Sequence, residues 1–192
     1  MSGRVVICGV GALGSTAAVL LRNLEADLVF IDFDRVESKN LAAQAFTKVA
    51  LGKNKAEALR LQLANFWGKK CEAFPVRLGR DNAGTLLAGA TLLIDAFDNQ
   101  ASRLLLSAHA RTLQVPLVHA AMSADGSYGV VRWDERFVAD AEDTPGQATC
   151  EGGQHLPFIG VIAAHLARVV QDHLQSGTRR DVQISLSSAL LL

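Results

Sequence analysis

The chain has 192 residues, 49% of them hydrophobic and 20% charged, a composition that indicates one globular domain over residues 1–192 and excludes a disordered chain. Lys and Arg together number 19, as do Asp and Glu, and this zero net charge argues against a broad surface for nucleic acid or an anionic membrane. No run reaches the roughly 18 apolar residues of a membrane span and no apolar leader precedes the first strand-like run, so we expect a cytoplasmic protein.

The first elements in the chain form a predicted strand–helix–strand unit. Residues 4–8 (RVVIC) are a short apolar run, which predicts a strand buried on both faces. A helix is expected over residues 14–24, and residues 27–32 (DLVFID) predict a second buried strand. Units of this kind build parallel α/β sheets.

The rest of the chain alternates helices and strands in the same way. Further helices are expected over residues 53–66, 82–87, 100–113 and 158–175. Further strands are expected over residues 72–76, 90–95, 116–121, 126–133 and 181–186, the last at a sheet edge. Residues 33–52 are polar and irregular, and a crossover loop is expected at about residues 135–156. The order predicts an α/β fold, a Rossmann-like doubly wound, mostly parallel sheet with helices on both faces.

A glycine motif links the first strand to the first helix. Gly9, Gly11 and Gly14 have the spacing in which the first glycine permits a tight turn, the second lets a nucleotide approach, and the third lets helix and strand pack closely. The helix N-terminus favours phosphate, and Asp32, about twenty positions on, is placed to accept ribose hydroxyls. A turn without a ligand is the plain alternative. The motif alone fits an NAD(P)-binding oxidoreductase as well as an ATP enzyme.

Charged residues after the second strand favour ATP. Asp34 adds a second carboxylate beside Asp32, which hydride transfer does not need, and Lys53 and Lys55 offer ammonium groups to phosphate. Asp98 follows another core strand and is suited to hold Mg²⁺ against a triphosphate. Since strand carboxyl ends line the ligand crevice of such sheets, we expect these residues to converge there. The alternatives are a turn capped by Asp34 and a solvated helix start at the lysines.

Four motifs in this order resemble the ThiF/HesA/MoeB family, adenylyltransferases that activate ubiquitin-like and sulfur-carrier proteins. Besides the glycine turn, they are Asp-x-Asp-x-Val-Glu-x-x-Asn-Leu-x-x-Gln at 32–44, Gly-x-x-Lys at 52–55 and Asp-x-x-Asp-Asn-x-x-x-Arg at 95–103. The resemblance covers about residues 4–175.

The resemblance implies ATP and Mg²⁺ as cofactors and a set of site residues. It places Gly9, Gly11 and Gly14 at the nucleotide, Asp32 at the ribose, Asn40, Gln44 and Lys55 at the phosphates, and Asp98 at Mg²⁺; Asp34, Asn99 and Arg103 complete the candidate nucleotide-binding set. An ion pair of Arg103 with a surface carboxylate on its own helix is the plain alternative.

The reaction that the resemblance implies joins a protein carboxylate to AMP. The C-terminal glycine carboxylate of a small ubiquitin-like or sulfur-carrier protein ending in Gly-Gly would attack the α-phosphate of ATP, giving an acyl-adenylate and pyrophosphate. A homodimer, or a heterodimer with a homologue, is expected, with Asp98, Lys55 and Cys150 as the catalytic candidates.

Three departures from the family pattern stand out. The family phrase Asn-Leu-x-Arg-Gln has Ala43 at the arginine position, the chain begins three residues before the first strand without the family's arginine-bearing helix, and zinc-binding Cys-x-x-Cys pairs are absent. Arg35, Lys39 or Lys53 would have to replace the guanidinium, or a partner subunit would supply it. The alternative function is a degenerate nucleotide-binding partner subunit without adenylation activity.

Cysteine and histidine supply the remaining candidates. Cys150 lies just before the last predicted helix, where the family resemblance implies a thiol that receives the acyl group or transfers sulfur; an inert loop thiol is the alternative, since nearby acids raise a thiol pKa. Cys8 is expected to be structural, and Cys71 lies at a strand edge. His119, at a strand end, either borders the pocket or is hydrogen-bonded within the fold, and we expect the latter.

Overall fold

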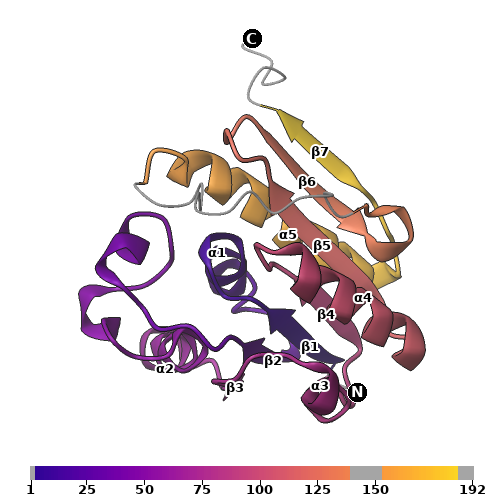
Figure 1. The fold of residues 1–192 in the computed structure, drawn as a ribbon, viewed down its shortest axis with the longest axis horizontal. Helices are drawn as coiled ribbons and strands as arrows, with labels where there is room; N and C mark the ends of the chain where they lie inside the picture. Colours follow the sequence, from indigo (N-terminus) through magenta and orange to yellow (C-terminus); the bar gives the residue numbers. More distant parts are fainter. Residues whose placement is uncertain (1–2, 139–152, 186–192) are drawn as a thin grey trace.

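The structure is a computed structural model that describes residues 3–138 and 153–185. Its strands form one seven-stranded sheet in the order β3-β2-β1-β4-β5-β6-β7 (Figure 1). The strands are β1 (Gly3–Cys8), β2 (Ala26–Ile31), β3 (Cys71–Phe74), β4 (Leu92–Asp95), β5 (Leu117–Met122), β6 (Tyr128–Trp133) and β7 (Val182–Ser185). The first five strands in this order, β3, β2, β1, β4 and β5, pair in parallel, while β6 and β7 are each antiparallel to the strand before them. The mostly parallel, doubly wound sheet is confirmed, and β7 lies at its edge.

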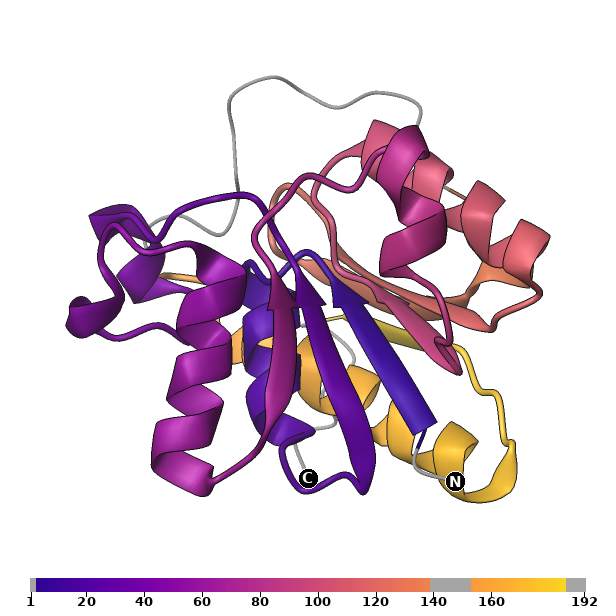
Figure 2. The same cartoon turned by 90° about the horizontal axis from the view of Figure 1, so that it is seen from below.

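Helices cover both faces of the sheet, as expected. They are α1 (Ala12–Leu20), α2 (Lys55–Trp67), α3 (Arg80–Leu86), α4 (Gln100–Leu113) and α5 (Leu156–Ser176), with short 3₁₀ turns at Ser38–Ala42, Lys48–Ala50 and Asp134–Arg136. Figures 1 and 2 show α1, α2 and α5 on one face and α3 and α4 on the other. None of the described helices has the length and apolar character needed to cross a membrane.

The two-faced core follows from the alternation of side chains along the central strands. Val5 and Ile7 of β1 pack with the α1, α2 and α5 side, whereas Val6 and Cys8 pack with the α3 and α4 side. All four side chains are fully buried. This explains why the strand reads as a continuous apolar run rather than an alternating one.

The carboxyl ends of the inner strands are aligned in one row. Cys8 of β1 pairs with Ile31 of β2 and Asp95 of β4, and Asp95 pairs in turn with His119 of β5. The chain builds outward from β1 through β2 to β3, then returns to place β4 on the other side of β1. The crevice at such a reversal is where open α/β sheets bind their ligands.

Element boundaries differ from the sequence predictions by a few residues. The helix expected from residue 53 begins at Lys55, because the Asn54 side chain accepts a hydrogen bond from the Glu57 N–H and caps the helix. The first helix begins at Ala12 rather than residue 14, and the strand expected from residue 90 begins at Leu92. The last helix begins at Leu156 with a proline in its first turn, which suits a helix start.

Candidate nucleotide-binding site

The glycine turn between β1 and α1 leaves no room for side chains at two of its three glycines. Gly9 has a φ of +83°, and a Cβ there would lie 2.8 Å from the Ala96 carbonyl oxygen. A Cβ on Gly14 would lie 2.0 Å from the Gly9 carbonyl oxygen. A Cβ on Gly11 would meet nothing within 4 Å. The backbone at Gly11 is thus open to an incoming group, next to the N–H groups that begin α1.

Asp32 joins the glycine turn to the segment that follows β2. Its Oδ2 accepts a hydrogen bond from the Val10 N–H at 2.8 Å, and its Oδ1 accepts one from the Asp34 N–H at 2.8 Å. The side chain is buried, and burial raises its pKa above the ordinary value, although the Val10 and Asp34 hydrogen bonds and the charge of Lys55 oppose that rise. Each carboxylate oxygen has a second lone pair, so a ribose hydroxyl can still be accepted.

Asp34 and Lys55 form an ion pair beside Asp32. Lys55 Nζ lies 3.1 Å from Asp34 Oδ2, and the Lys55 side chain is only 9% exposed while that of Asp34 is 48% exposed. Asn54 strengthens the junction by donating to the carbonyl oxygens of Asp32 and Asp34. The ammonium is therefore fixed at the helix start rather than solvated.

The turn that carries Asn40 and Gln44 is docked against α1. The Ala45 N–H donates to Ser15 Oγ at 3.0 Å, and Ser15 is fully buried in the first half of α1. Asn40 is buried, and its side-chain oxygen accepts from the Glu37 N–H. Gln44 Oε1 is buried and has no hydrogen-bond partner within the described residues. The Gln44 amide oxygen can accept a hydrogen bond from a hydroxyl, and after rotation of the amide by 180° its NH₂ group can donate to a phosphate oxygen.

Ala43 belongs to the hydrophobic core. Its side chain is 1% exposed and packs in the cluster shared with α1, α2 and α5. Two basic residues near Ala43 in sequence contact other groups: Arg35 donates to the Gly52 carbonyl oxygen, and Lys39 Nζ lies 3.6 Å from Glu37 Oε2. Arg4 pairs with a glutamate of β3 at the amino end of β1, away from the crevice.

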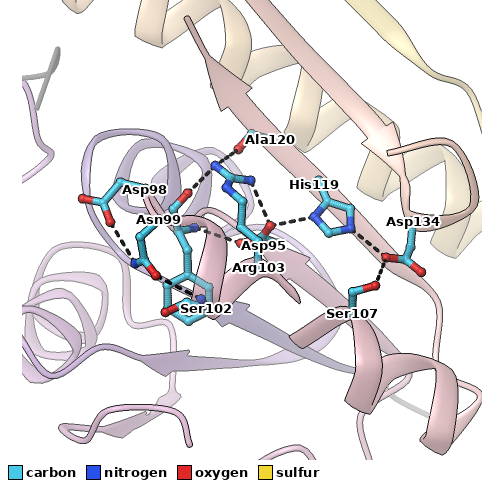
Figure 3. A network of polar contacts seen from close by, with 10 residues as sticks. Asp95, Asp98, Asn99, Ser102, Arg103, Ser107, His119, Ala120 and Asp134 are labelled. Atoms are coloured by element: carbon cyan, nitrogen blue, oxygen red, sulfur yellow. Dashed lines mark hydrogen bonds and ion pairs between the residues drawn. The ribbon is translucent and has the colours of Figure 1, made fainter. Parts of the chain in front are cut away.

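Asp98 lies on the loop between β4 and α4. The loop is fixed where it leaves the sheet, since the Ala96 N–H donates to the Cys8 carbonyl oxygen. Asp98 is exposed, and among the described residues its Oδ1 accepts a long 3.3 Å hydrogen bond from Asn99, whose own Oδ1 caps α4 (Figure 3). The described residues contain no group of three or more His, Cys, Asp or Glu side chains suited to a metal. Asp98 therefore fits Mg²⁺ only in the manner of sites that combine one carboxylate with substrate phosphates and water.

Arg103 points into the protein. Its guanidinium donates to Asp95 Oδ2 at 2.9 Å and to the carbonyl oxygens of Ala120 and Phe97 (Figure 3). The partner carboxylate belongs to a buried strand rather than to the surface of α4. A direct role of Arg103 in nucleotide binding stays a prediction.

The two described cysteines are poor nucleophiles. Cys8 is fully buried, and burial, together with the charge of Asp95, raises its pKa far above the ordinary value. Burial likewise raises the pKa of Cys71 to about 11. Both thiols are protonated at neutral pH, in agreement with a structural role for Cys8. Cys150 lies outside the described residues.

A cavity of about 490 Å³ lies beside the start of α2. None of the three motif glycines lines the cavity, so it is separate from the glycine turn. Some of its lining residues are the sequence neighbours of Asp34 and Lys55. Its lining residues are Phe33, Arg35, Gly52, Lys53, Asn54, Glu57, Leu61 and Pro75.

Sequence reasoning missed the residues that brace the site. Asn54 is the helix cap, and the spacing Asn54-x-x-Glu57 is a sequence signal for such a cap. Ser15 and Asp134 carried no local signal, because their partners are distant in the chain: Ala45 for Ser15, and His119 for Asp134. His119 is fully buried and hydrogen-bonded within the fold, as expected.

Comparison with known proteins gives concordant matches. The model of the ThiF family matches residues 1–175. Over 171 residues the chain is 32% identical to the molybdopterin-synthase adenylyltransferase of Salmonella typhimurium, covering 84% of this chain and 68% of that protein. It is 37% identical over 131 residues to the sulfur carrier protein adenylyltransferase of Thermus thermophilus, covering 66% of this chain and 48% of that one.

The fold is also found in solved structures. The crystal structure of E. coli MccB with ATP superposes with a TM-score of 0.77 at 17% identity, covering 97% of this chain and 61% of that chain. At this level of identity the likeness concerns the fold alone. The chain thus spans from about half to two thirds of the length of these matched proteins.

Proposed function

Because the chain belongs to the ThiF family, we propose that it is an adenylyltransferase that uses ATP to activate the C-terminal carboxylate of a small ubiquitin-like or sulfur-carrier protein. The observation that carries the proposal is Asp32. Its two oxygens hold the glycine turn and the Asp34–Lys55 pair in one unit, so that groups suited to ribose and phosphate meet at the strand ends. The relatives in Salmonella typhimurium and Thermus thermophilus are both named as adenylyltransferases, the second of them of a sulfur carrier protein.

The residues divide the work by charge and by position. The first N–H groups of α1 donate hydrogen bonds to phosphate oxygens, and Asp32 accepts hydrogen bonds from the ribose hydroxyls. Lys55 places positive charge near the phosphates. Asp98 is the residue to hold Mg²⁺, which when bound offsets the negative charge of the triphosphate. A carboxylate oxygen of the partner attacks the α-phosphorus while the bond to the departing pyrophosphate breaks. No proton moves, so the protein acts by positioning and charge.

Acyl transfer to a cysteine is a further part of the proposal. Cys8 and Cys71 are protonated thiols, which leaves Cys150 as the candidate acceptor. In this step the Cys150 sulfur attacks the acyl carbon of the acyl-adenylate, so that a thioester forms, the bond to the phosphate breaks, and AMP leaves while the thiol proton goes to solvent. Incubation with ATP and the partner protein tests the step, since a thiol-sensitive conjugate of the two chains forms with the native protein and is lost in Cys150→Ala. A conjugate that survives Cys150→Ala would exclude this role.

Exchange of radiolabelled pyrophosphate into ATP tests the proposal as a whole. We expect exchange that depends on a small protein ending in Gly-Gly, encoded near this chain, and that is lost in Asp98→Asn. Asp81→Asn, an exposed acid on α3, is the matched control and should keep wild-type exchange. Absence of exchange with every encoded candidate, in a folded protein, would contradict the catalytic claim.

The second candidate function is a nucleotide-binding partner subunit that has lost adenylation. Ala43 favours it, because a buried methyl group stands where the family resemblance places a guanidinium. Calorimetric titration with Mg·ATP, combined with the pyrophosphate-exchange assay, separates the two functions. ATP binding without pyrophosphate exchange indicates a partner subunit, and ATP binding with pyrophosphate exchange indicates the enzyme.

The proposed homodimer or heterodimer is tested by analytical ultracentrifugation of the chain alone and of the chain mixed with a homologous chain.

A further inference from the structure

Three ionisable side chains form a line behind the Asp98 loop. His119 Nδ1 lies 2.6 Å from Asp95 Oδ2, and His119 Nε2 lies 3.0 Å from Asp134 Oδ1 (Figure 3). Asp95 and His119 are fully buried, and Asp134 is 9% exposed. The three residues come from β4, β5 and the 3₁₀ turn after β6, and none of them has been assigned a part in the proposed reaction.

The imidazole of His119 is placed to donate to the two carboxylates. A carboxylate oxygen can only accept, so a ring nitrogen of His119 that carries a hydrogen donates it to the aspartate that faces it. The two carboxylates also accept from other donors. Arg103 donates to Asp95, and Ser107 and Arg111 donate to Asp134. These groups, with His119, offset the burial that would otherwise raise the pKa of Asp134, so that this pKa lies below its ordinary value.

At one end the line fixes the loop that carries Asp98. Asp95 Oδ1 accepts from the Phe97 N–H at 3.0 Å, and Arg103, held by Asp95, donates to the Phe97 carbonyl oxygen. Both polar groups of the Phe97 backbone therefore depend on the position of Asp95. Asp98 is the next residue in the chain.

At the other end the line fixes the segment that follows β6. Asp134 begins the 3₁₀ turn, and the ring of Phe137 stacks on the imidazole of His119 with centroids 4.0 Å apart and planes within 5°. The Arg103 guanidinium lies 5.5 Å from the centroid of the same Phe137 ring. His119 is thus in contact with both the β4–α4 connection, through Asp95, and the turn after β6.

We propose that His119 is a positioning residue that holds Asp95 and Asp134 together, so that the backbone around Phe97 presents Asp98 to Mg·ATP. The proposal rests on the proposed function, in which Asp98 receives the metal. Without the imidazole, two buried carboxylates lose a shared donor and the Phe97 backbone loses its fixed partner. Groups that orient a metal ligand from behind commonly change metal affinity or activity by roughly tenfold to a hundredfold when mutated.

The test compares His119→Gln with His165→Gln, an exposed histidine of α5. In the full-length protein without ligand, we expect faster hydrogen exchange in His119→Gln over residues 96–99 and 134–138, with β1 unchanged. In pyrophosphate exchange, the Mg²⁺ concentration for half-maximal rate should rise roughly tenfold or more, with the KM for ATP at saturating Mg²⁺ changed much less. His165→Gln should match the wild type in both measurements. If His119→Gln leaves hydrogen exchange at both segments unchanged, and leaves the Mg²⁺ concentration for half-maximal rate unchanged, the proposal is overturned.

A milder variant covers the case in which His119→Gln unfolds. Ser107→Ala removes one donor to Asp134 and should raise hydrogen exchange over residues 134–138 with a smaller rise in the Mg²⁺ requirement. No change in either measurement would overturn the proposal. Hydrogen exchange does not depend on catalysis, so a wild-type protein without pyrophosphate exchange would contradict the proposed function and leave the role of His119 to be judged from the two segments.

Discussion

At the scale of single residues, Asp32 has the most demanding position in the proposed site. It is buried, and the ionised form is the one that accepts well from both backbone N–H groups and, in the proposed function, from a ribose hydroxyl. Burial raises its pKa, so the ionised form is harder to reach in the folded chain than in the unfolded one. Its contribution to stability is therefore present below the unfolded pKa and is lost as the pH rises through the folded pKa. The site keeps this carboxylate at a cost in stability.

The raised pKa of Asp32 predicts a pH dependence of nucleotide binding. ATP affinity should fall as the pH drops through the folded pKa, which lies above the ordinary value of 3.8, because the protonated carboxyl accepts poorly. Calorimetric titration of the native protein and Asp32→Asn between about pH 4 and pH 7 measures this. The ATP phosphates titrate in both proteins, so the difference between the two curves isolates Asp32. Parallel curves would contradict the prediction.

Gly14 and Gly11 are expected to respond differently to the same added methyl group. Gly14→Ala places a Cβ 2.0 Å from the Gly9 carbonyl oxygen and should lower the free energy of unfolding by about 3 kcal/mol. Gly11→Ala meets no atom within 4 Å and should change it by less than about 0.5 kcal/mol. Urea denaturation checks both values.

ATP binding completes this comparison. Because the Gly11 backbone is the open part of the turn, Gly11→Ala should weaken ATP binding roughly tenfold, or about 1.4 kcal/mol, in a folded protein. Normal affinity in Gly11→Ala would place the phosphates elsewhere.

At the scale of elements, α2 is attached to the site through its first residues. Asn54 caps the helix and also donates to the carbonyl oxygens of Asp32 and Asp34. Asn54→Ala removes the cap and leaves these two acceptors without their donor, so we expect a loss of roughly 1–3 kcal/mol in thermal or urea unfolding.

A second asparagine gives the control for this loss. Asn82 accepts from the Gly79 N–H and donates to the Arg77 carbonyl oxygen at the more exposed start of α3, so Asn82→Ala should cost about 1 kcal/mol or less. Equal losses in the two variants would contradict the special role of the α2 start.

Element type followed from sequence more readily than element boundaries did. The apolar runs of β1, β2 and β4 predict buried strands because both of their faces are covered by helices. Boundaries depend on local hydrogen bonds that the apolar pattern does not contain, such as the Asn54 cap that sets the start of α2. Strand β4 begins at Leu92, the residue that pairs with Val5 of β1, and this long-range pairing is likewise not contained in the apolar pattern.

At the scale of the whole molecule, the convergence of motifs at the strand ends was predictable, but the bracing behind them was not. Gly9 and Asp32 follow strands whose ends are in register, so their proximity is a property of the parallel sheet. The line from Asp95 through His119 to Asp134 needs strands and a turn brought together from distant parts of the chain. Periodicity and spacing carry no information on such contacts, and the inward direction of Arg103 was missed for the same reason.

The strand order predicts an uneven protection of the sheet. Strands β1 and β4 lie inside it with helices on both faces, whereas β3 and β7 are edge strands whose residues are partly exposed. Native-state hydrogen exchange should therefore be slowest over Gly3–Cys8 and Leu92–Asp95 and faster over the two edges, Cys71–Phe74 and Val182–Ser185. Mass spectrometry of peptic peptides measures these rates. Equal protection of β7 and β1 would indicate that another surface covers the β7 edge.

The close contact at Gly9 means that the glycine turn and the Asp98 loop can change in evolution only together. A Cβ at Gly9 would lie 2.8 Å from the Ala96 carbonyl oxygen and 3.1 Å from the Phe97 ring, so each segment is moulded on the other. A chimaera that imported one of these segments from a relative would bring a surface shaped for a different neighbour. Successful recombination within the family should therefore carry both segments together, although α1, β2, α2, β3, α3 and β4 lie between them in the chain.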